Sequence, residues 1–392
     1  MAFAPVRRVL PLLMAMLLAS PALAAKLVVA TPATLNTALA QLLPGDTLQL
    51  VGVFTSRISI RDRDFGGVLV DGSQATLREG MHLRNIHNIS FHDLTIGSHD
   101  AGTASLMAVS MDGSTHVSFN RARVLGNGDD RGTGMRITNS QFVTVRDSLF
   151  DRNVDGITLN NTPDSLLTGN SFTNGGSDGL KIADSQRVIV SHNSCTNFQT
   201  IAGVHPDCIQ FWSKPGNPLQ SDIYVLNNLV IGDQQGFTSF DPAELSGTRF
   251  TFAGNYAAIT RVHALACFGC TESRFEDNVI SSLPQSIWAA NLHVPGGSNN
   301  IFSNNLIFDL RGVNGALADI LPARVMSAIV PSIAGMVGSR HDDRSWDVDE
   351  VVVAQSAVNP VPEPGSWLMM GAGFVMIGRA MRRRSPHRVV MA

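Results

Sequence analysis

A short segment recurs along most of the chain and constrains its fold more than any other feature. It reads approximately apolar-x-apolar-x-x-Asn-x-apolar. Clear copies span residues 165–172, 188–195, 223–230, 250–257, 273–280 and 300–307, and weaker copies span 89–96, 117–124 and 143–150. The marker asparagines at 170, 193, 228, 255, 278 and 305 are separated by 23, 35, 27, 23 and 27 residues. This period, with alternation inside each copy and no amphipathic helix between copies, indicates a stacked solenoid of short strands.

Further short strands lie between the markers, for example at 134–137, 155–159, 178–182 and 207–211. Two or three strands per turn with tight corners predict an all-β, single-stranded parallel β-helix of about nine or ten coils. We interpret the marker asparagines as architectural. They tolerate the left-handed or bridge conformation at a corner, and stacked Asn side chains can form a hydrogen-bonded ladder.

The first coil of such a stack needs a cover over its unpaired edge and apolar interior. Residues 34–43 place Leu35, Ala38, Leu39 and Leu42 at helical spacing, and Pro44-Gly45-Asp46 then ends the helix before a strand at 47–50. We therefore expect an N-terminal cap and first coils at 25–80, repeats at 81–310, and a C-terminal cap and linker at 311–360.

Both ends of the chain have the pattern of targeting segments. Residues 1–24 combine Arg7 and Arg8, an apolar run and Ala22-Leu23-Ala24, as in a secretory signal peptide removed by signal peptidase. Residues 361–366 read Val-Pro-Glu-Pro-Gly-Ser, followed by an apolar run at 367–378 and basic residues at 379 and 382–384. This tail at 361–384 resembles the PEP-CTERM sorting signal of Gram-negative bacteria. The resemblance implies export, processing by an exosortase and an exopolysaccharide-producing envelope.

The bulk composition sets further bounds. A formal net charge of −3 gives no basic face for nucleic acid. The four cysteines, at 195, 208, 267 and 270, are expected in an oxidising compartment. The Cys267-x-x-Cys270 pair is then either a local disulfide or two core thiols, rather than a metal site. We expect a monomer.

Acidic residues precede a strand in three consecutive coils, at Asp155, Asp178 and Asp207. Equivalent positions in neighbouring coils lie about 4.8 Å apart, so these carboxylates should form a row. Three residues further on, a parallel outward row is expected, consisting of Arg136, Thr158, Lys181 and Gln210. Stacked like charges repel, and a cation, a basic side chain or protonation must offset them. The three acids are therefore candidate Ca²⁺ ligands, with turn capping as the alternative.

The string from His205 to Trp212 is the most distinctive in the chain. Pro206 holds His205 extended beside Asp207, and Trp212 offers a flat face for a sugar ring. Longer loops at about 198–206 and 213–220 flank this strand, and inserted loops tend to wall a site. We expect Thr158, Gln210 and Trp212 to bind substrate, with Lys181 or Arg136 as base if burial depresses the pKa, or His205 otherwise.

Residues 150–240 resemble the pectate-lyase-like superfamily of right-handed β-helix proteins, and His205 to Trp212 is similar to a string in members that are uronan epimerases or lyases. Ser177 and the absence of Gly-His-Gly depart from polygalacturonases, and the Asp-Pro-His motif of mannuronan epimerases is absent. The resemblance implies action on acidic extracellular polysaccharide, as a uronan lyase or C5-epimerase. A glycoside hydrolase, inverting if it uses Asp155 and Asp207, and a non-catalytic polysaccharide-binding surface protein remain open.

The tail generates the first prediction. If an exosortase processes it, mass spectrometry of the mature protein should find no peptide that contains Arg382 to Arg384. A chain in which the Pro362-Glu363-Pro364 motif is replaced by alanines serves as the control and should keep these residues. Recovery of the unaltered chain from culture medium with its C-terminus intact would contradict the prediction.

Overall fold

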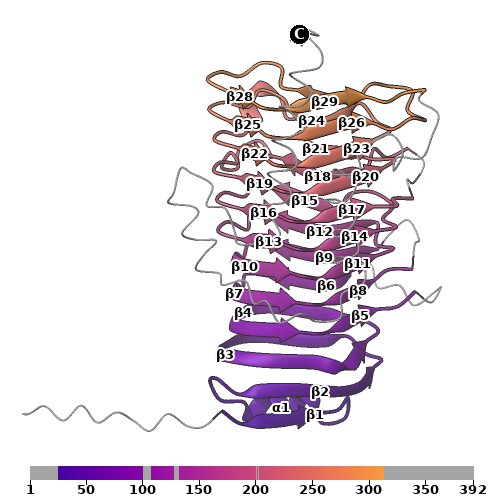
Figure 1. Ribbon diagram of the computed structural model, residues 1–392. Coiled ribbons are helices and arrows are strands. Elements are labelled where there is room, and N and C mark those ends of the chain that lie inside the picture. Colours follow the sequence, from indigo (N-terminus) through magenta and orange to yellow (C-terminus); the bar gives the residue numbers. More distant parts are fainter. Residues whose placement is uncertain (1–24, 100–106, 128–131, 200, 202, 313–392) are drawn as a thin grey trace, which may run out of the picture.

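The protein is a parallel β-solenoid of about ten coils, which confirms the predicted all-β fold. The structure, a computed structural model, describes residues 25–99, 107–127, 132–199, 201 and 203–312. Its strands stack in three columns, which we call sheets A, B and C (Figure 1). A coil runs through one strand of each sheet, and every strand pairs in parallel with its equivalents in the coils below and above.

Sheet A contains β4 (Met81–His92), β7 (Thr115–Asn120), β10 (Gln141–Arg146), β13 (Leu166–Thr168), β16 (Ile189–Ser191), β19 (Tyr224–Leu226), β22 (Thr251–Ala253), β25 (Arg274–Glu276) and β28 (Ile301–Ser303). Sheet B contains β5 (Thr95–Gly97), β8 (Arg123–Leu125), β11 (Leu149–Asp151), β14 (Ser171–Thr173), β17 (Ser194–Thr196), β20 (Leu229–Gly232), β23 (Tyr256–Ile259), β26 (Val279–Ser282) and β29 (Leu306–Asp309). Sheet C contains β6 (Met107–Asp112), β9 (Thr133–Thr138), β12 (Asp155–Asn160), β15 (Leu180–Ala183), β18 (Asp207–Trp212), β21 (Gln235–Ser239), β24 (His263–Cys267) and β27 (Asn291–His293).

The first coils have longer strands. These are β1 (Leu27–Ala30), β2 (Thr47–Phe54) and β3 (Ile58–Leu77), and β3 and β4 bend across corners so that each pairs with strands of two sheets. The one α-helix of the described residues, α1 (Leu35–Gln41), lies at this end of the stack beside β1 and β2 (Figure 1). Leu35 and Leu39 pack against the core, and Arg63 donates to the carbonyl oxygens of Leu39 and Leu42. The helix therefore has the position expected of the cap.

The interior is filled by one apolar residue stacked on the next from coil to coil. Phe252 packs flat on Phe275 with ring centroids 5.3 Å apart, and Phe302 continues this stack at 5.0 Å. Phe252 and Phe275 are fully buried, whereas Phe302 in the last described coil is 49 % exposed. The predicted C-terminal cap at 311–360 lies almost entirely outside the described residues, so it stays a prediction.

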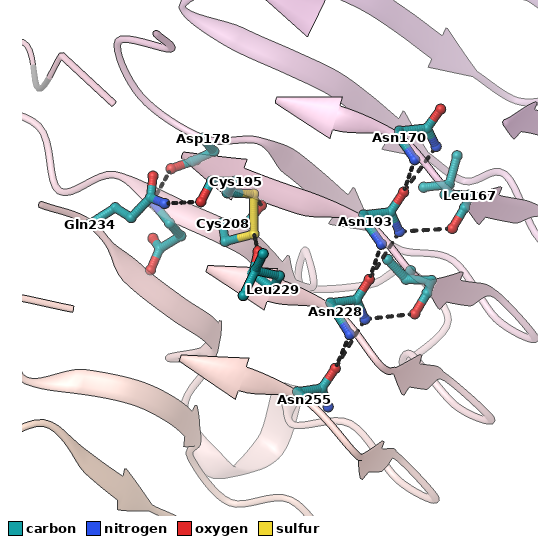
Figure 2. Close-up of a disulfide and its surroundings, with 12 residues drawn as sticks. Leu167, Asn170, Asp178, Asn193, Cys195, Cys208, Asn228, Leu229, Gln234 and Asn255 are labelled. Carbon is teal, nitrogen blue, oxygen red and sulfur yellow. Dashed lines mark hydrogen bonds between the residues drawn. A yellow bond between two sulfur atoms is a disulfide. The ribbon is translucent and has the colours of Figure 1, made fainter. Parts of the chain in front are cut away.

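The marker asparagines form a buried ladder at the corner between sheets A and B. From Asn170 to Asn305, each side-chain amide donates to the side-chain oxygen of the next marker at 2.9–3.1 Å. Each such oxygen also accepts the backbone N–H of the marker in the coil below. Figure 2 shows four of these stacked amides. These hydrogen bonds confirm the predicted ladder of stacked Asn side chains.

We expected the marker asparagines themselves to take the left-handed or bridge conformation at the corner. The left-handed conformation is instead found one residue earlier. The left-handed φ belongs to the residue before each marker, which is Gly169, His192, Asn227, Gly254, Asp277 or Asn304. The marker itself turns its side chain inward, because there its amide can satisfy backbone groups at the corner that have no water to bond.

Among the described residues, no helix is both long enough and apolar enough to span a membrane. The predicted signal peptide and the apolar run at 367–378 lie outside these residues.

The ladder generates a stability prediction. Asn228→Ala removes the acceptor of the Asn193 backbone and side-chain N–H groups and the donor to the Val190 carbonyl oxygen. Each buried group left unpaired costs about 1–3 kcal/mol, so we expect a loss of at least about 3 kcal/mol in the free energy of unfolding. Denaturant titration measures it. Asn227→Gly, at the exposed neighbour with φ of 53°, should change it little, and equal losses for both variants would contradict the ladder's role.

Candidate functional site

The strand register brings the predicted residues together on sheet C. Thr158 pairs with Arg136 below and with Lys181 above, and Lys181 pairs with Gln210. Asp155 and Asp207 open β12 and β18, and Asp178 lies between them just before β15. These are the two parallel rows expected from the sequence, one of acids and one of outward polar side chains.

Lys181 links the lower two acids. Its Nζ lies 2.8 Å from Oδ1 of Asp155 and 3.1 Å from Oδ2 of Asp178. The Asp178 side chain is only 4 % exposed, whereas Asp155 and Lys181 are partly exposed. Stacked carboxylates were expected to need a compensating charge or a proton. The Lys181 ammonium group supplies a positive charge beside two of the three acids.

Asp207 is fully buried and accepts hydrogen bonds on both oxygens. Thr238 Oγ1 donates to Oδ1 at 2.8 Å, and Gln210 Nε2 donates to Oδ2 at 3.3 Å. The Nδ1 atom of His205 lies 3.2 Å from Oδ2, while 63 % of the His205 side chain is exposed. An accessible imidazole is thus oriented by a buried carboxylate, the arrangement that fixes a histidine tautomer for proton transfer.

The acids also bind the backbone of the coil above. Asp178 Oδ1 accepts the Asp207 N–H at 2.8 Å, and Asp155 Oδ1 lies 3.4 Å from the Asp178 N–H. Asp155 and Asp178 therefore help to hold the backbone of the next coil, which agrees with the turn-capping alternative. Only one oxygen of Asp178 is used in this way, and the other faces Lys181.

Burial dominates the electrostatics of the upper two acids. Desolvation raises the pKa of Asp178 to about 7 despite the nearby Lys181 ammonium, and the Asp207 carboxylate adds to the increase. Desolvation also raises the pKa of Asp207, opposed by the hydrogen bonds from His205 and Thr238. Asp178 can therefore carry a proton near neutral pH and act as a general acid.

The basic groups shift in the direction that keeps them protonated. The hydrogen bond to Asp207 raises the pKa of His205. For Lys181, desolvation lowers the pKa, but the charges of Asp178 and Asp155 outweigh it and the net pKa is raised. The condition under which Lys181 was expected to act as a base, a depressed pKa, is not met. Lys181 is instead a fixed positive charge.

The remaining predicted residues lie around this centre. Arg136 is exposed and lies two coils below Lys181, about 10 Å along the stack. Trp212 is half-buried at the end of β18, with Lys214 Nζ 5.1 Å from its ring centroid. The 213–220 loop is tied to Asp184 through the Lys214 N–H and the Asn217 amide, each at 2.7 Å.

The three carboxylates do not fit a calcium ion as they are arranged. Lys181 Nζ already lies between Asp155 and Asp178, and both oxygens of Asp207 accept hydrogen bonds. Within the described parts of the chain, no three His, Cys, Asp or Glu side chains are placed to hold a metal ion. Calcium binding stays a prediction, and at this row it would require Lys181 to be displaced.

A disulfide fixes the base of the loop that carries His205. Cys195 of β17 bonds to Cys208 of β18, next to Asp207, and both cysteines are fully buried. Figure 2 shows this bond in the same region as Asp178, with Gln234 Nε2 donating to the Cys195 carbonyl oxygen at 2.9 Å. Cys267 and Cys270 form a second disulfide, which decides between the two alternatives for that pair.

Sequence reasoning missed several neighbours in the coils above. Thr238 continues the outward row after Gln210, and Gln235 and His263 continue the acid row. Phe240 contacts His205 edge-on with ring centroids 6.3 Å apart. Thr238, Gln235 and His263 could have been predicted by counting strand positions from the next marker asparagine. They were missed because β21 and β24 contain no acidic residue, which was the feature used to find the row.

The buried acid generates a pH prediction. Because the folded-state pKa of Asp178 is about 7 and its ordinary value is 3.8, its contribution to stability is complete below about pH 4 and is lost as pH rises towards 7. Asp178→Asn cannot ionise and keeps an oxygen for the Asp207 N–H. Its melting temperature should therefore rise relative to wild type between pH 5 and pH 8.

Asp164→Asn is the matched control. The Arg187 hydrogen bond lowers the pKa of Asp164, so its titration lies below this pH window and the difference from wild type should be flat. Parallel curves for Asp178→Asn and wild type would show that Asp178 does not hold a proton.

Comparisons with known proteins concern the C-terminal tail and the fold. Residues 360–384 match the PEP-CTERM protein-sorting motif, which indicates export to the surface or beyond. No curated protein matches the chain. Solved structures with a similar fold include pectate lyase Pel9A, with 14 % identity, a TM-score of 0.47 and coverage of 70 % of this chain and 79 % of that one.

Two further structures widen the range of functions found on this fold. An alginate lyase from Paenibacillus sp. has 15 % identity and a TM-score of 0.40, covering 71 % of this chain and 98 % of its own. The surface adhesin PfbA of Streptococcus pneumoniae has 12 % identity and a TM-score of 0.42, covering 66 % and 80 %. Likenesses at this level concern the fold alone. The model of the right-handed β-helix region, however, matches residues 56–260, more than half of the sequence, and the chain therefore belongs to that family.

Proposed function

We propose that the protein is an exported enzyme that removes the C5 proton of uronic-acid residues in an acidic polysaccharide, as a lyase or a C5-epimerase. The observation that carries the proposal is the His205–Asp207 pair, which lies one coil above Asp178, an acid that holds a proton near neutral pH. The sorting motif supports a substrate in the cell envelope or outside it.

Each residue has a role that its surroundings permit. Asp207 accepts the Nδ1 proton of His205, so that Nε2 is left to take the C5 proton. Asp178 then gives its proton to the departing O4 in a lyase, while the C4–O4 bond breaks and a C4–C5 double bond forms. In an epimerase the C4–O4 bond stays intact, and Asp178 gives its proton to C5 from the face opposite to His205, which keeps the proton it removed. Lys181 and Arg136 offer positive charge to the substrate carboxylate, which stabilises the carbanion.

These roles set the pH dependence. His205 must be neutral and Asp178 protonated, so activity should rise with pH as the imidazole loses its proton and fall as the Asp178 carboxyl does. Since Asp207 raises the pKa of His205 and burial raises that of Asp178 to about 7, the profile should be bell-shaped and narrow around neutral pH.

A glycoside hydrolase is the second candidate, and one distance favours it. Lys181 Nζ contacts oxygens of both Asp155 and Asp178, so those oxygens are at most about 6 Å apart. This upper bound is compatible with the separation of about 5–5.5 Å between the paired carboxyls of retaining enzymes. The pair would hydrolyse a bond with Asp178 as the acid, without an unsaturated product.

The test is incubation of the purified protein with alginate and polygalacturonate. Ultraviolet absorbance of an unsaturated product identifies a lyase, and a changed sugar composition without cleavage identifies an epimerase. We expect His205→Asn and Asp178→Asn each to lower the rate by about 10²- to 10⁴-fold, because each removes a proton-transfer group.

His116→Asn, at an exposed histidine of sheet A, is the control and should leave the rate unchanged. New reducing ends without absorbance would favour the hydrolase. Binding of these polymers without any reaction would contradict the proposal and favour a non-catalytic surface protein.

A further inference from the structure

Three aromatic residues occupy the same position in successive coils of sheet C. Phe211 pairs with Ser239 and Ser239 pairs with Cys267, so the residues that follow them, Trp212, Phe240 and Phe268, stack in register. This aromatic row runs parallel to the Lys181–Gln210–Thr238 row, two residues further along each strand, which is about 7 Å.

The aromatic row does not belong to the interior. Phe211 and Phe237 of the same strands are fully buried in the core, whereas Trp212, Phe240 and Phe268 are half-buried and absent from its clusters. The alternation of side chains along a strand accounts for this, because neighbouring residues point to opposite faces. Large apolar rings on an outward face of a secreted protein need a reason other than folding.

Two histidines, His263 and His293, contact these rings. Phe240 contacts His263 edge-on at 5.2 Å between centroids, and His263 stacks on His293 at 5.7 Å. Phe268 contacts both Phe240 and His293, at 5.2 and 5.3 Å. The outward row continues from Thr238 through Ala266, which is fully buried, to His293.

The backbone beneath Phe268 is held firmly. The Cys267–Cys270 disulfide closes the turn that contains it. The Phe268 N–H donates to the Ser239 carbonyl oxygen at 2.9 Å, and the Gly269 N–H donates to that of Pro295 at 2.8 Å. Because the backbone at Phe268 is already held, binding a ligand there orders little additional chain.

We propose that Trp212, Phe240 and Phe268 form a sugar-stacking surface that binds successive residues of a polyuronate chain lying along the solenoid axis. The apolar C–H faces of the sugar rings would pack on the aromatic rings, while carboxylates and hydroxyls face Lys181 and Gln210, which are partly exposed. The surface extends from the acid–base centre only towards the C-terminal coils. Three coils separate Lys181 from Ala266, so the bound chain spans about 14 Å beyond the reacting sugar.

This inference rests on the proposed substrate class, but binding can be measured apart from catalysis. The probes are alginate and polygalacturonate in affinity electrophoresis of the full mature protein, with Kd from the concentration dependence of migration. Phe268→Leu keeps an apolar side chain but removes the ring, and we expect Kd to rise about fivefold for the polymer that wild type binds best. Phe268→Tyr keeps the ring and should stay within about twofold of wild type.

Two comparisons make the result decisive. Phe142→Leu alters an exposed phenylalanine of sheet A and should leave Kd unchanged. Phe240→Leu repeats the test one coil lower, in case Phe268→Leu lowers the melting temperature enough to affect folding. Equal affinity of both Leu variants and wild type would overturn the stacking surface, as would failure of wild type to bind either polymer. Loss of turnover without loss of binding in Asp178→Asn concerns the proposed function and leaves this surface standing.

Discussion

Parallel pairing between equivalent strands of successive coils is the constraint on which the rest of the molecule depends. It places every residue about 4.8 Å from its counterpart in the next coil, so one position in the repeat becomes one row on the solenoid. Rows of apolar residues fill the interior, as the Phe252, Phe275 and Phe302 stack shows. The Asn ladder satisfies the polar groups of a corner that water cannot reach.

The same geometry creates the electrostatic problem at the candidate site. Stacking Asp155, Asp178 and Asp207 brings carboxylates together that would repel each other if all were ionised. Two features of the structure offset this repulsion: ion pairs of Lys181 with Asp155 and Asp178, and hydrogen bonds to Asp207. Burial also raises the pKa of Asp178 to about 7, which favours its neutral form below that pH. A row that stabilises the turns of the next coil thus also holds groups able to give and take protons.

Two local features depart from the regular repeat: a long interval between marker asparagines and a pair of disulfides. The long interval between Asn193 and Asn228 provides the loop that carries His205, and the Cys195–Cys208 disulfide fixes its base beside Asp207. The second disulfide holds Phe268 at the end of the aromatic row. The proposed acid–base residues and the proposed binding surface both follow the strands of sheet C, so they occupy one face of the molecule.

The sequence by itself determined the solenoid, its helical cap, the register of the rows and the targeting motif, because a repeat that pairs with itself has only one way to keep its apolar positions inside. The residues gathered around Asp178 followed from that register. Three-dimensional contacts decided what the register leaves open. Residues before the marker asparagines take the left-handed conformation, Lys181 forms ion pairs with Asp155 and Asp178, and Thr238, Phe240 and His263 adjoin the site. These depend on side-chain directions, burial and the net balance of nearby charges, which are properties of the packed coil and not of the spacing along the chain.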